Sequence, residues 1–138
     1  MPNPIDSHAF TVRQSDCDFY GHMNIARYID GCSDGGFMIQ DAWGLTREDV
    51  LTGRKLAFAV VGANSSYFRE LRVGDQVQVR SSLDKIGGKS AQVTHSFYKG
   101  DTKVFESVFS LVLMSMESRT AVPVPDDLRA DMLAAHAD

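Results

Sequence analysis

The sequence is poor in cysteine and proline and has no long hydrophobic segment. Only two of its 138 residues are Cys and four are Pro. Cys17 and Cys32 belong to no CxxC pair or spaced Cys/His set, so neither a disulfide framework nor a zinc site is indicated. No uncharged apolar run is long enough to span a bilayer, and residues 1–6 lack the basic and apolar regions of a signal peptide. We therefore expect a soluble, cytoplasmic protein without a metal ion, a cofactor or a membrane partner.

Basic residues are in the minority. The chain has 14 Lys and Arg against 18 Asp and Glu, a net charge of −4, which predicts no broad basic surface for a phosphate backbone. Repeats, low-complexity tracts and linkers rich in Pro, Gly or Ser are also lacking. A chain of this length that is 43% hydrophobic can bury one core. We expect a single domain over residues 1–138 and no nucleic-acid partner.

The strongest pattern is that of a long apolar helix. Apolar residues recur at helical spacing over residues 25–43, after Asn24, a favourable N-cap residue, and Gly44 can end the helix. Three glycines lie inside this segment: Gly31, Gly35 and Gly36. Each costs about 1 kcal/mol in helix propensity relative to Ala. This cost indicates that a sheet packs closely against these positions.

The rest of the chain predicts mainly strands. Alternating or continuous apolar patterns define five segments: residues 8–15, 56–70, 77–83, 91–97 and 104–114. The last is apolar at almost every position, as expected for a strand covered on both faces. Short Gly-containing turns separate the later segments, which indicates a meander-like antiparallel arrangement. Two short helices are expected, over residues 46–53 and 126–135.

The order of these elements predicts an α+β architecture. One strand precedes the long helix and four follow it. A lone helix with apolar residues all round must be buried by a sheet that wraps around it. We therefore expect a long central helix wrapped by a roughly five-stranded antiparallel sheet.

Residues 12–30 contain a specific motif, which reads VRQSDCDFYGHMNIARYID. It resembles the active-site signature of the hydroxybenzoyl-CoA thioesterase family of hotdog proteins. Residues 68–75, FRELRVGD, look like the family's strand end and Gly-Asp turn, and residues 88–90, GKS, resemble its hairpin tip. The resemblance covers most of residues 8–116. It implies the hotdog fold, acyl-CoA thioesterase activity, and a homodimer or dimer of dimers whose active sites lie between two subunits.

The resemblance also implies catalytic roles. The family's acidic residue corresponds to Asp18, as nucleophile or general base, and its oxyanion donor is a backbone N–H near Ile25. The chemistry is consistent, because a helix N-terminus offers free N–H groups and a positive dipole end to the tetrahedral oxyanion, while a carboxylate upstream attacks or activates water. His22 either polarises the carbonyl, hydrogen-bonds Asp18 or fixes the loop backbone. Asn24 is foremost a helix cap beside the site.

Substrate contacts are expected from the loop, the helix and the long strand. The candidate lining residues are Tyr20, Tyr28, Phe58, Val60 and Asn64. Lys89 matches a family position near the bound nucleotide, whereas some members carry arginines where this chain has Gly87 and Gly88. The phosphate contacts are therefore expected to differ. The acyl group is not readable from the sequence, and an acyl carrier protein is an alternative thiol carrier.

Several other residues have structural interpretations. Asp16 is expected to hydrogen-bond turn backbone, and Cys17 and Cys32 to be small core residues. His95 alternates with apolar neighbours, which indicates a partly buried histidine whose hydrogen bonds are satisfied. A metal held by Asp16, Asp18 and His22 is only weakly indicated.

Two other functions are compatible with the pattern. An acyl-CoA hydratase or dehydratase also pairs an Asp with a His, but its signature has a Pro between them and a different spacing. A non-catalytic module that binds acyl-CoA is the other alternative. The retained acid and the lack of an attached partner domain argue against it.

Overall fold

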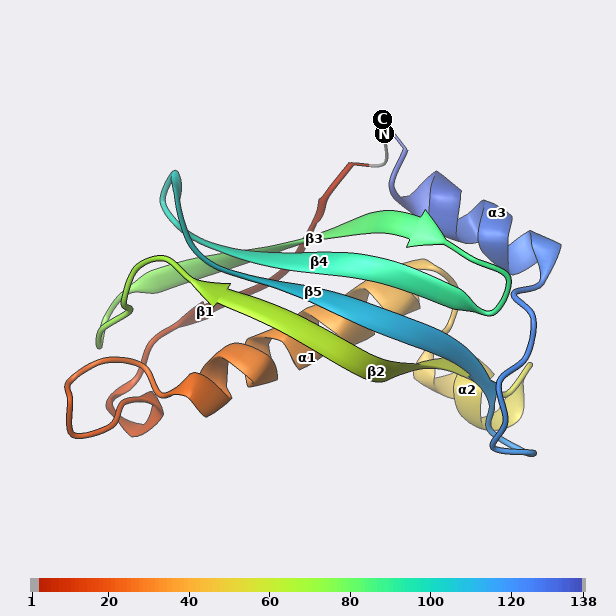
Figure 1. The fold of residues 1–138 in the computed structure, drawn as a ribbon, viewed down its shortest axis with the longest axis horizontal. Helices are drawn as coiled ribbons and strands as arrows, with labels where there is room; N and C mark the ends of the chain where they lie inside the picture. Colours follow the sequence, from red (N-terminus) through yellow and green to blue (C-terminus); the bar gives the residue numbers. More distant parts are fainter. Residues whose placement is uncertain (1–2, 138) are drawn as a thin grey trace.

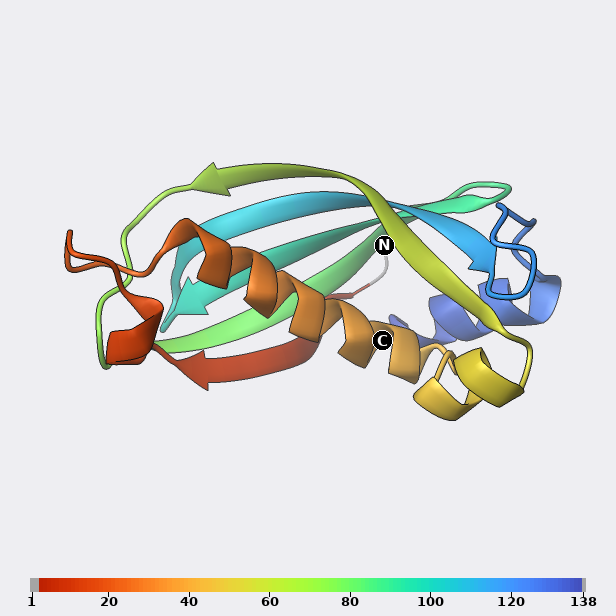
Figure 2. The ribbon, with the colours of Figure 1, turned by 90° about the horizontal axis from the view of Figure 1, so that it is seen from below.

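The computed structural model describes residues 3–137 and shows a five-stranded antiparallel sheet that curves over one long helix (Figures 1 and 2). The elements are β1 (Ile5–Thr11), a 3₁₀ turn (Gln14–Asp16), α1 (Ile25–Ala42), α2 (Arg47–Thr52), β2 (Leu56–Tyr67), β3 (Gln76–Ile86), β4 (Ser90–Lys99), β5 (Thr102–Ser115) and α3 (Asp126–Ala135). The α+β hotdog architecture expected from the sequence is confirmed. None of the helices between residues 3 and 137 has the length and hydropathy needed to cross a membrane.

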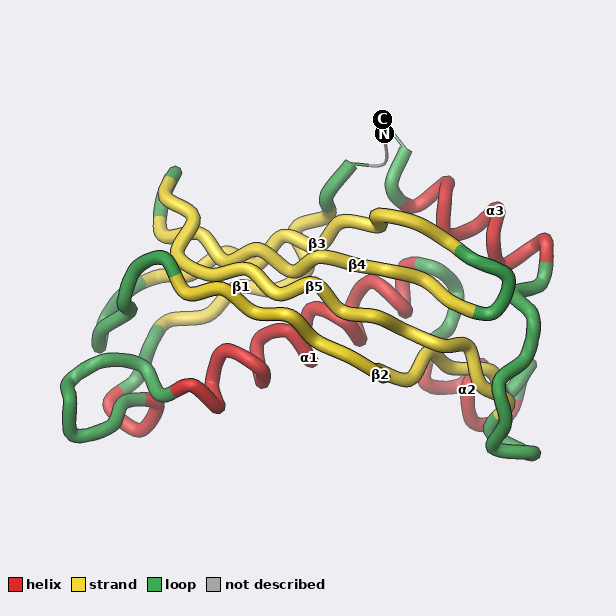
Figure 3. Tube along the Cα trace, viewed as in Figure 1, coloured by secondary structure: helices red, strands yellow, loops and turns green. Residues whose placement is uncertain are grey.

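The strand order is β1-β3-β4-β5-β2, which corrects the expectation of a meander. Only β3, β4 and β5 follow one another as neighbours joined by hairpins. β2 pairs with β5 at one edge, while β1 pairs with β3 at the other edge. Between β2 and β3 the chain therefore crosses from the β2 edge of the sheet to the strand that lies next to β1 (Figure 3). The alternation of apolar residues identifies each strand but does not indicate which strands it pairs with. For this reason the sequence did not predict the strand order.

Helix α1 begins and ends where its sequence signals lie. The Asn24 side chain accepts a hydrogen bond from the Ala26 N–H at 3.0 Å, and Gly44 follows the C-cap with φ +89°. A Cβ at Gly31 would lie 2.7 Å from a ring carbon of Phe97, and one at Gly35 would lie 2.9 Å from the Ser7 hydroxyl. The sheet does pack closely against these two positions.

One face of α1 is left open, which corrects the expectation that the helix is enclosed all round. Phe37 and Met38 are 71% and 51% exposed, although both are apolar. The sheet covers only the side that carries Tyr28, Cys32 and Ile39, all of them buried. The apolar residues of the opposite side therefore form a surface.

Several boundaries and faces differ from expectation. The first strand lies over residues 5–11 because residues 14–16 form a 3₁₀ turn, and β2 ends at Tyr67 rather than at residue 70. β5 alternates mostly between buried and half-buried residues, so the outer face of this strand is only partly covered. The C-terminal helix buries Leu128 and Met132, but Leu133 is 50% exposed.

His136 ties the end of the chain to the core. The Trp43 Nε1–H donates to His136 Nε2 at 3.0 Å, so the imidazole proton is on Nδ1, which donates to the Asn3 carbonyl at 2.8 Å. The Asn3 N–H donates in turn to the His136 carbonyl at 2.6 Å. Asn3 and His136 therefore lie side by side, although they are 133 positions apart in the sequence.

Candidate active site

The segment between β1 and α1 forms a closed loop that projects beyond the first turn of α1 (Figure 1). An isolated bridge between Cys17 and Met23 closes its base. Inside it the Asp18 N–H donates to the His22 carbonyl at 3.2 Å, and the Gly21 N–H donates to the Asp18 carbonyl at 3.0 Å. Gly21 has φ +86°, a conformation that favours glycine. The motif thus folds into a tight turn with Asp18 at its base.

Only one oxygen of the Asp18 carboxylate accepts a hydrogen bond from the described residues. Its Oδ1 accepts the Tyr20 N–H at 2.9 Å, which is an Asx-type turn, and the residue is partly exposed. Oδ2 accepts no hydrogen bond from any described residue. One carboxylate oxygen therefore orients the side chain, and the other is available to a ligand or to water.

The start of α1 presents a free backbone donor. The Ala26 N–H is satisfied by the Asn24 side chain at 3.0 Å, and the Arg27 N–H by the Asn24 carbonyl at 2.9 Å. Within residues 3–137 the Ile25 N–H has no acceptor. A free N–H at the positive end of an 18-residue helix is suited to stabilising an oxyanion. Asn24 contributes here by positioning the helix end.

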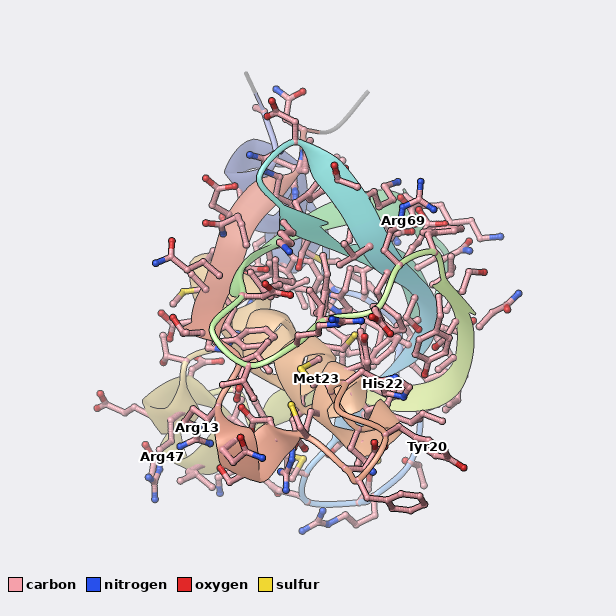
Figure 4. The ribbon with its side chains drawn as sticks, turned by 90° about the vertical axis from the view of Figure 1, so that its left-hand side faces the viewer. Arg13, Tyr20, His22, Met23, Arg47 and Arg69 are labelled. Carbon is pink, nitrogen blue, oxygen red and sulfur yellow. The ribbon has the colours of Figure 1, made fainter. Side chains whose placement is uncertain are left out.

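The His22 ring contacts Glu70 and makes no hydrogen bond or ion pair with the Asp18 carboxylate. The His22 Nδ1 is 3.5 Å from Glu70 Oε2, and the His22 ring stacks on Tyr20 with centroids 5.6 Å apart. The Arg72 guanidinium, and to a smaller extent His22, lowers the pKa of the Glu70 carboxyl. Tyr20 and His22 lie on the same side of the loop, whereas Arg13 lies on the other (Figure 4). Glu70 was not among the predicted site residues, although it belongs to the segment 68–75 that resembles the family.

A shallow pocket of about 340 Å³ adjoins this end of the helix. Its walls include Ile25, Tyr28 and Tyr67, and the Tyr28 and Tyr67 rings meet edge to face with centroids 5.1 Å apart. Burial raises the pKa of Tyr28 to about 12, so its hydroxyl stays protonated. The pocket thus combines aromatic rings with the polar side chains of His22, Arg69 and Glu70, and it lies against the Ile25 end of α1.

The structure does not bring all the predicted substrate residues to Asp18. Tyr28 lines the adjoining pocket, and Tyr20 is on the loop with 72% of its surface exposed. Phe58 and Val60 line a separate cavity further along α1, and Asn64 is exposed on β2. Lys89 lies at the opposite end of the sheet, where its carbonyl accepts the Leu113 N–H at 2.8 Å. One chain alone therefore does not assemble the expected site.

Asp16 and the cysteines follow their structural interpretations. Asp16 is 7% exposed and accepts the Arg13 N–H at 2.8 Å, which lowers the pKa of its carboxyl. Cys32 is fully buried, and Cys17 packs against the core. Across residues 3–137, no group of three or more His, Cys, Asp or Glu side chains is arranged to hold a metal ion.

His95 departs from expectation. It is completely buried rather than partly so, and its Nε2 has no hydrogen-bond partner among the described residues. The expectation of a satisfied histidine is therefore wrong for one ring nitrogen. Periodicity placed this side chain on the inner face of β4 but carried no information about its partners on other strands.

Comparisons with known proteins agree with this fold. The family model described as the thioesterase-like superfamily matches residues 12–132. The chain is 29% identical over 125 residues to the long-chain acyl-CoA thioesterase FadM of Escherichia coli, covering 86% of this chain and 89% of that protein. It is 25% identical over 118 residues to a 1,4-dihydroxy-2-naphthoyl-CoA hydrolase of Nostoc punctiforme, covering 86% and 80%. The Staphylococcus aureus protein SAV2348, solved in complex with CoA, superposes with a TM-score of 0.88 at 18% identity, covering 99% and 86%.

Proposed function

Because the chain belongs to the thioesterase-like superfamily and is thereby a thioester hydrolase, we propose that it cleaves an acyl-CoA to the free acid and coenzyme A. The two curated relatives above are both named as hydrolases of CoA thioesters. One observation carries the proposal. The Asp18 carboxylate has one oxygen without a hydrogen bond from residues 3–137, and its loop leads directly to the Ile25 N–H, which has no acceptor there either.

The proposed reaction uses these two groups in sequence. The thioester oxygen accepts a hydrogen bond from the Ile25 N–H at the positive end of α1. Asp18 Oδ2 either attacks the carbonyl carbon, forming an acyl anhydride that water then hydrolyses, or removes a proton from the attacking water. On either route the tetrahedral intermediate collapses with cleavage of the C–S bond, and coenzyme A leaves as a thiolate that takes up a proton. Both routes yield the acid and the thiol.

The remaining motif residues are proposed to position this machinery. Asn24 caps Ala26 and so leaves Ile25 as the donor that faces substrate. His22, held between Tyr20 and Glu70, stiffens the loop that carries Asp18. Lys89 is proposed to contact a phosphate of coenzyme A. Since Lys89, Phe58 and Val60 lie away from Asp18 within one chain, the complete site requires a second copy.

A homodimer through β2 and α1 is proposed for this reason. β2 is a 12-residue edge strand, and such an edge offers free backbone groups for pairing. Beside it lie exposed apolar side chains on both elements: Ile29, Phe37, Met38, Val60 and Val61. Exposed apolar side chains on two neighbouring elements support an interface there. Light scattering on the wild type should give twice or four times the chain mass, and Val61→Lys should shift it towards the monomer. A wild-type monomer at micromolar concentration contradicts the dimer.

Thiol release from a panel of short, long, aromatic and polar acyl-CoAs tests the activity. Asp18→Asn should lose about 10²-fold or more in kcat/KM while keeping the fold, because the amide is neither a nucleophile nor a base. Asp30→Asn, on the exposed face of α1, is the matched control and should leave turnover unchanged. Binding of acyl-CoA without thiol release by the wild type contradicts hydrolysis and favours the binding module, whereas hydration of an enoyl-CoA favours the hydratase.

A further inference from the structure

Phe19 and Tyr20 form an exposed aromatic tip on the loop that carries Asp18. The two residues are 92% and 72% exposed, and their rings stack with centroids 4.5 Å apart. Aromatic side chains of this size are usually buried at least in part, because each removes about 150–250 Å² of surface from water. The Tyr20 N–H also donates to Asp18 Oδ1 at 2.9 Å, so the position of the aromatic tip fixes that of the carboxylate.

A pocket of about 540 Å³ lies at the other end of α1, between the end of this helix, α2 and the start of β2. Its wall is mainly apolar and includes Leu45, Val50, Leu51 and Phe58. Pockets of this size accept groups larger than a pair of aromatic rings. Arg47 also lines the pocket and forms no ion pair within residues 3–137. The pocket is therefore suited to an aromatic segment that is accompanied by a negative charge.

Within one chain the aromatic tip and this pocket cannot meet. The loop precedes α1 and α2 follows it, and the 18 residues of α1 extend for about 27 Å between them (Figure 2). Any aromatic tip that enters the pocket must therefore come from a second copy of the chain.

The homodimer proposed above brings the two features together. A two-fold axis makes the same edge strand run in opposite directions in the two copies. The exposed residues Val60 and Val61 lie near the middle of β2, so an axis there places the start of each β2 beside the end of the other. The start of β2 borders the pocket through Ala57, whereas Tyr67 at its end contacts Tyr28 in the first turn of α1. In this dimer the pocket of one copy faces the Asp18 loop of the other.

We propose that the aromatic tip of each copy docks into the α2 pocket of the other copy and so holds Asp18 in place. The inference rests on the proposed function and its homodimer, and it names the part of the second copy that completes each site. The rings of the tip match the apolar wall. The charges also match, because Arg47 of the pocket is unpaired and Asp18 Oδ2 accepts no hydrogen bond within residues 3–137.

Leu51→Arg places a charged side chain in the pocket wall and should prevent docking. Thiol release should fall by about 10-fold or more, mainly in kcat, because a loop that is not held in place misplaces the carboxylate. The dimer mass in light scattering should stay unchanged, since β2 and α1 are not altered. Leu133→Arg on α3 is the matched control, because Leu133 is 50% exposed and Leu51 is 55% exposed. This control should keep the wild-type rate, and an equal rate for Leu51→Arg overturns the docking.

Co-expression of Leu51→Arg with Asp18→Asn shows whether loop and pocket belong to different copies. In a hybrid dimer the intact loop of the Leu51→Arg chain faces the intact pocket of the Asp18→Asn chain, so one site of two is complete. Random pairing of equal amounts makes about half of the dimers hybrid, and thiol release should reach about a quarter of the wild-type rate. A rate no higher than the mean of the two parents overturns the docking and leaves the thioesterase function standing.

Cysteine pairing tests the docking without turnover. A chain with both Tyr20→Cys and Leu51→Cys should form a disulfide-linked dimer under mild oxidation, because the paired Cα atoms must come within about 7 Å. Tyr20→Cys alone, and Tyr20→Cys combined with Leu133→Cys, should stay single chains on a non-reducing denaturing gel. Absence of the linked dimer overturns the docking, even if the protein hydrolyses acyl-CoA. If the dimer forms and the wild type hydrolyses no acyl-CoA, the docking stands and the proposed function fails.

Discussion

The buried imidazole of His95 makes the stability of this protein depend on pH in a way that can be worked out. Burial lowers its pKa to about 4 in the folded state, against 6.5 as its ordinary value. Between these values the unfolded chain binds a proton that the folded protein excludes, so the free energy of unfolding falls as the pH falls. The contribution is fully present above pH 6.5 and declines down to about pH 4. At about 1.4 kcal/mol per pKa unit, the loss reaches about 2–3 kcal/mol near pH 4.5.

Urea denaturation between pH 7.5 and 4.5 measures this loss, with His95→Gln as the matched control. The Gln side chain can still hydrogen-bond Ser81, but it has no titratable group. Over this pH range the free energy of unfolding of the variant should therefore fall by about 2–3 kcal/mol less than that of the wild type. Burial also lowers the pKa of His136, but that contribution is present in both proteins and cancels. The carboxyl of Asp16, with its lowered pKa, titrates below this window. Equal losses in the two proteins refute the reasoning.

Three further substitutions test the packing of α1. Gly36→Ala should raise the free energy of unfolding by about 1 kcal/mol, because a Cβ there meets nothing closer than 3.9 Å and the helix gains propensity. Gly35→Ala gains the same propensity but brings a Cβ to 2.9 Å from the Ser7 hydroxyl. In urea denaturation this variant should therefore be about 1–3 kcal/mol less stable than Gly36→Ala. Equal stabilities of the two variants contradict the close approach of the sheet to Gly35. Trp43→Phe removes the donor to His136 Nε2 and should cost about 1–3 kcal/mol in the same assay, and a cost below about 0.5 kcal/mol contradicts a structural role for this bond.

Local signals in the sequence located the three α-helices and the five strands, with errors of a few residues at the ends of β1 and β2. Asn24 and Gly44 bound α1 because capping depends on a few adjacent backbone groups. Thr46 caps α2 by accepting the Asp49 N–H at 3.1 Å, as its spacing predicted. The position of β2 at the sheet edge was not predictable in this way, because alternation is identical for a strand at an edge and a strand in the middle.

The candidate site was readable only in part. The motif placed Asp18 and the helix start close together because they are a few residues apart, and the catalytic role of Asp18 stays a prediction. Glu70 reaches His22 from a segment far along the chain, so no local pattern indicated this pair. Lys89 lies at the end of the sheet opposite to Asp18 because of the direction in which β4 runs, and the sequence does not show this direction.

By itself the sequence determined the class of fold, the helix ends and the loop that carries Asp18, since each depends on hydrogen bonds and periodicity within a few residues. Only the tertiary structure decided the strand order, the open apolar face of α1 and the partners of His95. Ser7, Ser81 and His95 come from three strands and meet through a bulge in β1. The proton position on His95 depends on all three at once, because each hydroxyl has a single proton to donate.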